Sequence, residues 1–180
     1  AAQVGTTTAA LFFGGFNNSQ PGYSALVESW DGTNWTETGD LNTARAELAG
    51  SGTSTAALAF GGNTPPRTAV VESWNGSSWT ETGDLNTARN ELASSTGGTY
   101  TAALAFGGND GSATGATESW DGSSWTEVAD LATARRQLGG NGSYQNALAY
   151  GGYTTTNVGN TEEWTFSGLD PSTTPAADYS

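Results

Sequence analysis

The stretch Thr101-Ala-Ala-Leu-Ala-Phe106-Gly107-Gly108 has close copies at 9–15, 55–62 and 146–152. The glycine pairs that end the four copies are spaced 47, 46 and 44 residues apart. A spacing this regular is the signature of a repeat architecture, in which each repeat is one supersecondary unit. The sequence therefore predicts four copies of one structural unit.

A pair of tryptophans marks the second half of each unit. The first tryptophan follows a glutamate by two residues, and an Asp-Gly or Asn-Gly dipeptide separates it from the second. These dipeptides readily adopt the positive φ angles of a tight hairpin turn. The fourth unit lacks both the dipeptide and the second tryptophan. The glutamates are Glu28, Glu72, Glu118 and Glu162, and the tryptophans are Trp30, Trp35, Trp74, Trp79, Trp120, Trp125 and Trp164.

Each full period is expected to contain four strands. One follows an arginine, one ends in the glycine pair, one ends in the first tryptophan, and one carries the second tryptophan. The strand after the arginine is expected to begin at Glu47, Glu91 or Gln137. Four short antiparallel strands in about 45 residues make one blade of a β-propeller. The sequence therefore predicts an all-β fold, a four-bladed propeller of four-stranded antiparallel blades over residues 1–166.

The order of these landmarks resembles the kelch repeat: an arginine, a hydrophobic strand ending in Gly-Gly, a glutamate with an aromatic residue two positions later, and a turn before a tryptophan. The resemblance covers residues 1–166 and implies a kelch-like propeller. The period is shorter than the kelch repeat of about 50 residues, and the first unit has no arginine. The last blade is expected to be incomplete or completed by another segment. A closed ring of four, part of a larger ring and a longer array of rings are the alternatives.

Composition excludes several classes of function. The net charge is −13, with five arginines and no lysine, so the chain has no surface suited to neutralising nucleic-acid phosphates or to binding an acidic membrane. It has no cysteine and no histidine, which removes the thiolate nucleophile, the commonest general base and the commonest transition-metal ligand. No apolar run is long enough to span a bilayer. We expect no cofactor, and because the chain starts at Ala1 we expect a processed or excised piece of a longer product.

The charged residues of the repeat are expected to be structural. The arginines Arg45, Arg89 and Arg135 recur at one repeat position, and their predicted partners are the glutamates that precede the first tryptophan. A general acid and a general base must differ in environment, and residues that recur around a pseudosymmetric ring do not supply that difference. Asp110 lies outside the repeat pattern in Asn109-Asp-Gly111, where a turn is favoured over a calcium ligand. The sequence therefore predicts no catalytic or metal site.

Acceptor sequences for sugar occur at Asn17, Asn34, Asn75 and Asn141. Residues 167–180 break the repeat and are rich in Ser, Thr, Pro and Ala. This composition is typical of a linker or stalk, with Thr173 and Thr174 as candidates for O-linked sugar, and a plain chain terminus is the alternative.

These features favour a non-enzymatic extracellular or cell-surface module with a structural or adhesive role. Near-identical units favour self-association or neighbouring copies in a longer chain, as in a glycosylated fibre or filament. The alternative is a module that binds glycan or protein through the variable loops after the glycine pairs, with Tyr23, Arg67 and Tyr153 as candidate ligand residues. An enzyme such as a kelch-type copper oxidase is not favoured, because those enzymes use cysteine and histidine ligands.

Overall fold

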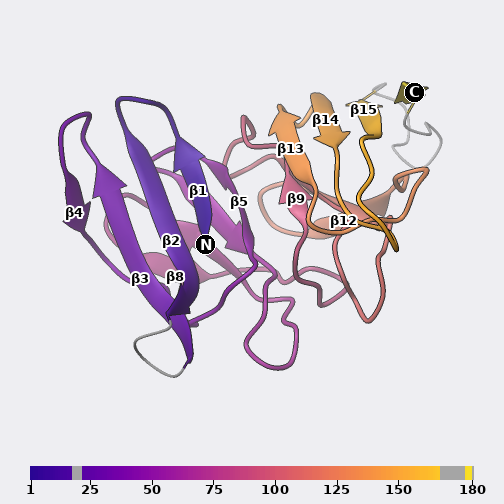
Figure 1. The fold of residues 1–180 in the computed structure, drawn as a ribbon. Helices are drawn as coiled ribbons and strands as arrows, with labels where there is room; N and C mark the ends of the chain where they lie inside the picture. The colour runs from indigo at the N-terminus through magenta and orange to yellow at the C-terminus, as the bar shows by residue number, and fades with distance from the viewer. Residues whose placement is uncertain (18–21, 167–176, 180) are drawn as a thin grey trace.

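The computed structural model describes residues 1–17, 22–166 and 177–179, and it is all-β, with no helix among those residues. Four antiparallel sheets are arranged as a four-bladed propeller (Figure 1), which confirms the predicted fold class. The first blade contains β1 (Ala2–Gly5), β2 (Ala10–Asn17), β3 (Gly22–Trp30) and β4 (Trp35–Glu37), and the second contains β5 (Ala49–Gly52), β6 (Ala57–Phe60), β7 (Val71–Trp74) and β8 (Trp79–Glu81). The third contains β9 (Ala93–Ser94), β10 (Ala103–Phe106), β11 (Thr117–Trp120) and β12 (Trp125–Val128).

The last blade has three strands from its own repeat, β13 (Gly139–Gly142), β14 (Asn146–Tyr150) and β15 (Thr161–Thr165). A separate short strand, β16 (Ala177–Tyr179), pairs with the outer edge of β15, with Thr161 opposite Tyr179. Another segment therefore completes the blade, which is one of the two expected outcomes. The prediction of a linker over 167–180 falls mostly outside the described residues.

The glycine pair follows the second strand directly in the last three blades and interrupts the register of β2 in the first, because it needs a backbone that other residues rarely adopt. Gly61 and Gly62 have φ angles of 64° and 110°. A Cβ on Gly61 would lie 2.7 Å from the carbonyl oxygen of Arg89, and the amide of Gly62 donates to that same oxygen over 2.8 Å. In the first three blades the glycine pair therefore fixes the second strand to the backbone of the arginine that follows in sequence.

Neighbouring blades contact each other through two kinds of face. The trailing face of a blade carries a leucine and an aromatic residue from its second strand, such as Leu11 and Phe13. The leading face of the next blade carries two alanines and the tryptophan pair, so that Ala57 and Trp79 share one buried cluster with Leu11 and Phe13. The ring centroids of Phe13 and Trp79 are 5.1 Å apart, and those of Phe60 and Trp125 are 5.0 Å apart. Small alanines leave room for the large tryptophans in the wedge between outer strands.

Between the last strand of one blade and the first strand of the next runs a segment that we call a linker. A buried ion pair joins each linker to the blade that follows it. Arg89 and Glu118 are 3.1 Å apart, Arg135 and Glu162 are 3.0 Å apart, and Arg45 pairs with Glu72 in the same way. All three arginine side chains are fully buried. The Glu72 carboxylate also accepts hydrogen bonds from the amide and side chain of Asn42 over 2.7 and 2.8 Å.

The ionisation of these arginines responds to two opposing effects. Burial lowers the pKa of the Arg45 and Arg89 guanidiniums, and the facing carboxylates act against that shift. The expected pairing does not extend to Glu28, which is exposed and has no arginine partner among the described residues, since no arginine precedes the first blade.

The first and fourth blades stand apart. The innermost strands contact each other in sequence order, β1 with β5, β5 with β9 and β9 with β13. Gln3 and Gly5 of the first blade and Asn141 and Tyr150 of the fourth instead line one cleft of about 630 Å³. Figure 1 shows β1 and β13 on separate sides of the view, with β5 between them and β9 beside β13. The propeller is therefore open at one position of its ring.

The hairpin turns between the outer strands are held by one side chain each. The Oδ1 atom of Asp121 accepts hydrogen bonds from the amides of Ser123 and Ser124 over 2.8 and 2.9 Å. Asp31 and Asn75 do the same in the first and second blades. The amide of Ser124, then the amide and hydroxyl of Ser123, lower the pKa of Asp121 to about 2.

Replacing Arg89 with methionine tests the buried pair. The change leaves the Glu118 carboxylate buried without its partner, so we expect the free energy of unfolding to fall by about 3–5 kcal/mol. The double variant Arg89→Met/Glu118→Met should recover most of this loss. Urea unfolding measures both, with Arg136→Met as the control, because the pair of Arg136 with Glu91 is partly exposed and should contribute at most about 1 kcal/mol. Equal losses in Arg89→Met and Arg136→Met would contradict this account.

The Asp121 turn predicts a pH dependence with a defined sign. The folded pKa of about 2 lies below the ordinary value of 3.8, so the stabilisation is complete above pH 3.8 and is lost as the pH falls through 2. Nuclear magnetic resonance should place the Asp121 titration near pH 2. Asp121→Asn should remove this part of the pH dependence of unfolding, since Asn75 holds the equivalent turn as an amide. An Asp121 midpoint near 3.8 would refute the prediction.

Candidate functional site

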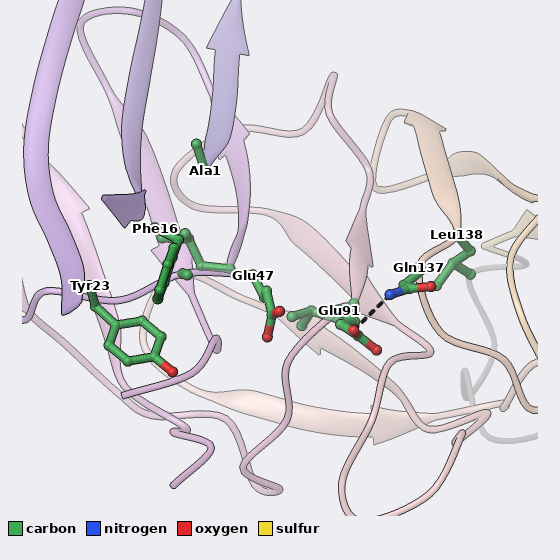
Figure 2. Close-up of a pocket in the computed structure, with 10 residues that line it drawn as sticks. Ala1, Phe16, Tyr23, Glu47, Glu91, Gln137 and Leu138 are labelled. Atoms are coloured by element: carbon green, nitrogen blue, oxygen red, sulfur yellow. Dashed lines mark hydrogen bonds between the residues drawn. The ribbon is translucent and has the colours of Figure 1, made fainter. Parts of the chain in front are cut away.

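A pocket of about 620 Å³ opens where the linkers enter the inner strands (Figure 2). It lies at the same end of the blades as the variable loops, because backbone bridges join Ala46 to Asn63, Asn90 to Asn109 and Arg136 to Tyr153. The three linkers and the first blade all contribute to its wall. The lining residues are Ala1, Phe16, Tyr23, Ala46, Glu47, Leu48, Glu91, Leu92, Gln137 and Leu138.

Three polar residues in this wall share an unusual backbone conformation. Glu47, Glu91 and Gln137 have φ angles of 58°, 56° and 55°, and they are the only residues other than glycine with positive φ in the described part of the chain. The amide of Glu91 donates to the carbonyl of Glu47, and the amide of Gln137 donates to the carbonyl of Glu91, both over 2.9 Å. Figure 2 shows the three side chains in a row. Such left-handed backbone costs about 1–3 kcal/mol and gathers at functional sites.

The sequence-based prediction placed strand starts at these three residues, and that was wrong. The strands begin two residues later, at Ala49, Ala93 and Gly139, because a left-handed residue does not continue a β-strand. The recurrence of the position after each linker arginine was visible in the sequence. The backbone conformation was not, since glutamate and glutamine have no preference for it.

A hydrogen-bond network holds the two glutamates. Gln137 Nε2 and Arg136 Nη1 each donate to Glu91, both over 2.8 Å, and they occupy both of its carboxylate oxygens. Asn90 Nδ2 donates to Glu47 Oε2 over 2.6 Å. Glu47 is exposed, its other oxygen accepts no hydrogen bond from the described residues, and the Ala1 ammonium attracts it electrostatically. Glu47 is therefore the carboxylate that remains open to a ligand.

An aromatic pair borders the pocket on the side of the first blade. The rings of Phe16 and Tyr23 meet edge to face with centroids 5.8 Å apart, and 64% of Phe16 is exposed. They lie on β2 and β3, which extend further in this blade than the equivalent strands of the others. The combined wall presents two aromatic rings, an open carboxylate and an amide to one space.

The three predicted ligand residues have different places. Tyr23 lines the pocket. Arg67 and Tyr153 do not line it, but they contact residues that do bond to its wall. Arg67 Nε donates to Asn90 Oδ1 over 3.2 Å, and the Tyr153 ring lies 5.1 Å from the Arg136 guanidinium carbon. Asn90 and Arg136 in turn hold Glu47 and Glu91.

The other candidate residues from the sequence, the possible sugar acceptors and Asp110, are not among the residues that line the pocket. Asn34 and Asn75 are exposed in hairpin turns at the opposite end of the blades, and Asn141 is exposed on β13. Asn17 is partly buried at the end of β2, and Thr173 and Thr174 lie outside the described residues. Asp110 Oδ1 accepts from the amide of Ser112, and Asn109 Oδ1 accepts from the amide of Gly111, as in a turn.

No group of three or more acidic, histidine or cysteine side chains suited to a metal occurs among the described residues. The same part of the chain has no helix able to cross a membrane. Neither a scan against protein-family models nor a search of curated proteins finds a significant match to this chain.

Two substitutions at Glu47 test whether the left-handed backbone of this residue is strained. Glycine adopts positive φ without the steric cost that alanine has, so we expect Glu47→Gly to be more stable than Glu47→Ala by about 1 kcal/mol. Urea unfolding measures the difference. At Glu37 in β4, whose φ is not positive, the order should reverse, because glycine weakens a strand. The same order at both positions would show that Glu47 carries no backbone strain.

Proposed function

We propose that this protein is a non-enzymatic adhesive module that binds an oligosaccharide in the pocket lined by Glu47, Glu91 and Gln137. The single observation that carries the proposal is the meeting of the aromatic pair Phe16 and Tyr23 with an open carboxylate and an amide in one concave wall. Binding sites combine apolar walls with a few placed polar groups. A sugar has the matching chemistry, since its hydroxyls donate to carboxylates and its C–H face packs on an aromatic ring.

Charge narrows the class of sugar. The chain has a net charge of −13, and two glutamates stand in the pocket wall. Acidic sugars would be repelled. The proposed ligand is therefore a neutral oligosaccharide or one that carries an amino sugar.

A binding role is favoured over hydrolysis. Glycoside hydrolases generally use two carboxyl groups, one as acid and one as base or nucleophile. Both oxygens of Glu91 are occupied by Arg136 and Gln137, which leaves Glu47 as the one carboxylate of the pocket that is free to act. A single free carboxylate suits recognition better than catalysis.

The kelch-like classification belongs to this proposal as well. It is supported by the order of arginine, glycine pair, glutamate and tryptophans within each propeller blade. An extracellular or cell-surface location remains a prediction. N-linked sugar at Asn34, Asn75 and Asn141 is also a prediction, and the exposure of these three residues supports it.

An array of immobilised neutral, amino-sugar and acidic oligosaccharides tests the proposal. We expect binding to neutral or amino-sugar chains, with affinity then measured by titration calorimetry on the best one. Tyr23→Ala and Glu47→Gln should each weaken binding about tenfold, since each removes a contact of roughly 1–1.5 kcal/mol. Tyr100→Ala is the control, because Tyr100 is a tyrosine at the surface (49% exposed) that does not line the pocket. Binding that is absent, or that Tyr23→Ala and Glu47→Gln leave unchanged, would overturn the proposal.

A further inference from the structure

The two end blades expose residues whose equivalents are buried at every internal interface. On the second strands, Leu58 and Leu104 are fully buried, whereas Leu148 of the last blade is 42% exposed. Phe60 and Phe106 are at most 2% exposed, whereas Tyr150 is 44% exposed. Along β14 the pattern alternates, with Ala147 and Ala149 buried against the third blade and the other side open. The trailing face of the fourth blade is therefore uncovered.

The leading face of the first blade is also uncovered, and it corresponds to the other side of the internal interfaces. Trp79 and Trp125 are 5% exposed, but Trp35 is 49% exposed. Phe12 takes the place of the buried alanines Ala59 and Ala105 and is 41% exposed. Apart from Phe12, which is larger than those alanines, the two end faces together contain both halves of an interface that the molecule already forms three times.

We infer that the leading face of the first blade docks on the trailing face of the fourth blade of a second copy of this chain. Trp35 would then lie on Tyr150 of the second copy, as Trp79 lies on Phe13 within one chain. The partner that covers these faces is a second copy of the chain, because every copy carries both complementary faces. Closure within one chain is disfavoured, since the two faces are separated by the cleft between the first and fourth blades and three buried ion pairs fix the blades between them.

Charge sets the strength of this contact. At the internal interfaces the glutamate of the leading face meets the arginine of the preceding linker. Glu28 is exposed, and no described residue at the trailing face of the fourth blade supplies an arginine. Docking would therefore take Glu28 out of water without a cation, which costs free energy. The association is accordingly reversible, and Glu28 limits its affinity.

The contact joins two different faces, so it is heterologous and forms either a closed ring or an open filament. This property gives a decisive test by sedimentation velocity over a range of concentrations. The wild-type chain should grow in mass as concentration rises. Trp35→Asp and Leu148→Asp, one on each face, should each remain monomeric alone, and Tyr100→Asp, another exposed aromatic residue, should behave as wild type.

Mixing the two variants separates docking from misfolding. Trp35→Asp retains a normal trailing face and Leu148→Asp a normal leading face, so an equimolar mixture should form a species of two chains and no larger one. Glu28→Gln should shift the wild-type association to several-fold lower concentration. A wild-type monomer at all concentrations, an assembly that both face variants leave intact, or a mixture that stays monomeric would overturn the inference. None of these variants lines the oligosaccharide pocket, so the two proposals fail independently.

Discussion

The buried arginine–glutamate pair is the interaction on which the rest of the structure depends. Its arginine is held at both ends: the backbone of Arg45 bonds to Ser24 and Gly15 of the first blade, while its guanidinium pairs with Glu72 of the second. One residue thereby fixes the position of two sheets that share no strand. A buried pair of this kind adds little net stability compared with well-packed apolar residues, but an unpaired buried charge is costly. The pair therefore acts mainly by excluding blade positions that would separate its two charges.

The candidate pocket follows from the same constraint. Because the arginine backbone is tied to one blade and its side chain to the next, the chain has only three residues, from Ala46 to Leu48, in which to turn into the inner strand. The turn is made by one residue with a left-handed backbone, and in two of the three linkers this residue is a glutamate, Glu47 or Glu91. The repeat thus places a strained polar residue at the same point in each linker, and the four-bladed arrangement brings them together around one space.

Sequence reasoning succeeded where a feature belongs to each unit. The four blades, the hairpin turn at Asp121-Gly122 and the pairing of Arg89 with Glu118 all depend on contacts that recur in at least three of the four units. It failed where a feature depends on how many units meet. The cleft between the first and fourth blades and the exposure of Glu28 arise at the ends of the array, where a unit lacks one neighbour. The left-handed backbone of Glu47 was missed for another reason, since it is imposed by its surroundings against local preference.

The two proposed contacts reinforce each other through geometry. Neighbouring blades within the chain keep their variable loops at the same end, and a second copy that docks through an equivalent interface would keep the same orientation. The pockets of successive copies would then face one direction. A shallow pocket with one open carboxylate and an exposed aromatic pair gives modest affinity for a single oligosaccharide. Several such pockets that face one glycan-bearing surface would bind it with an avidity roughly 10²–10⁴ above that of one pocket. Weak, reversible docking limited by Glu28 would then make adhesion depend on the local concentration of the protein.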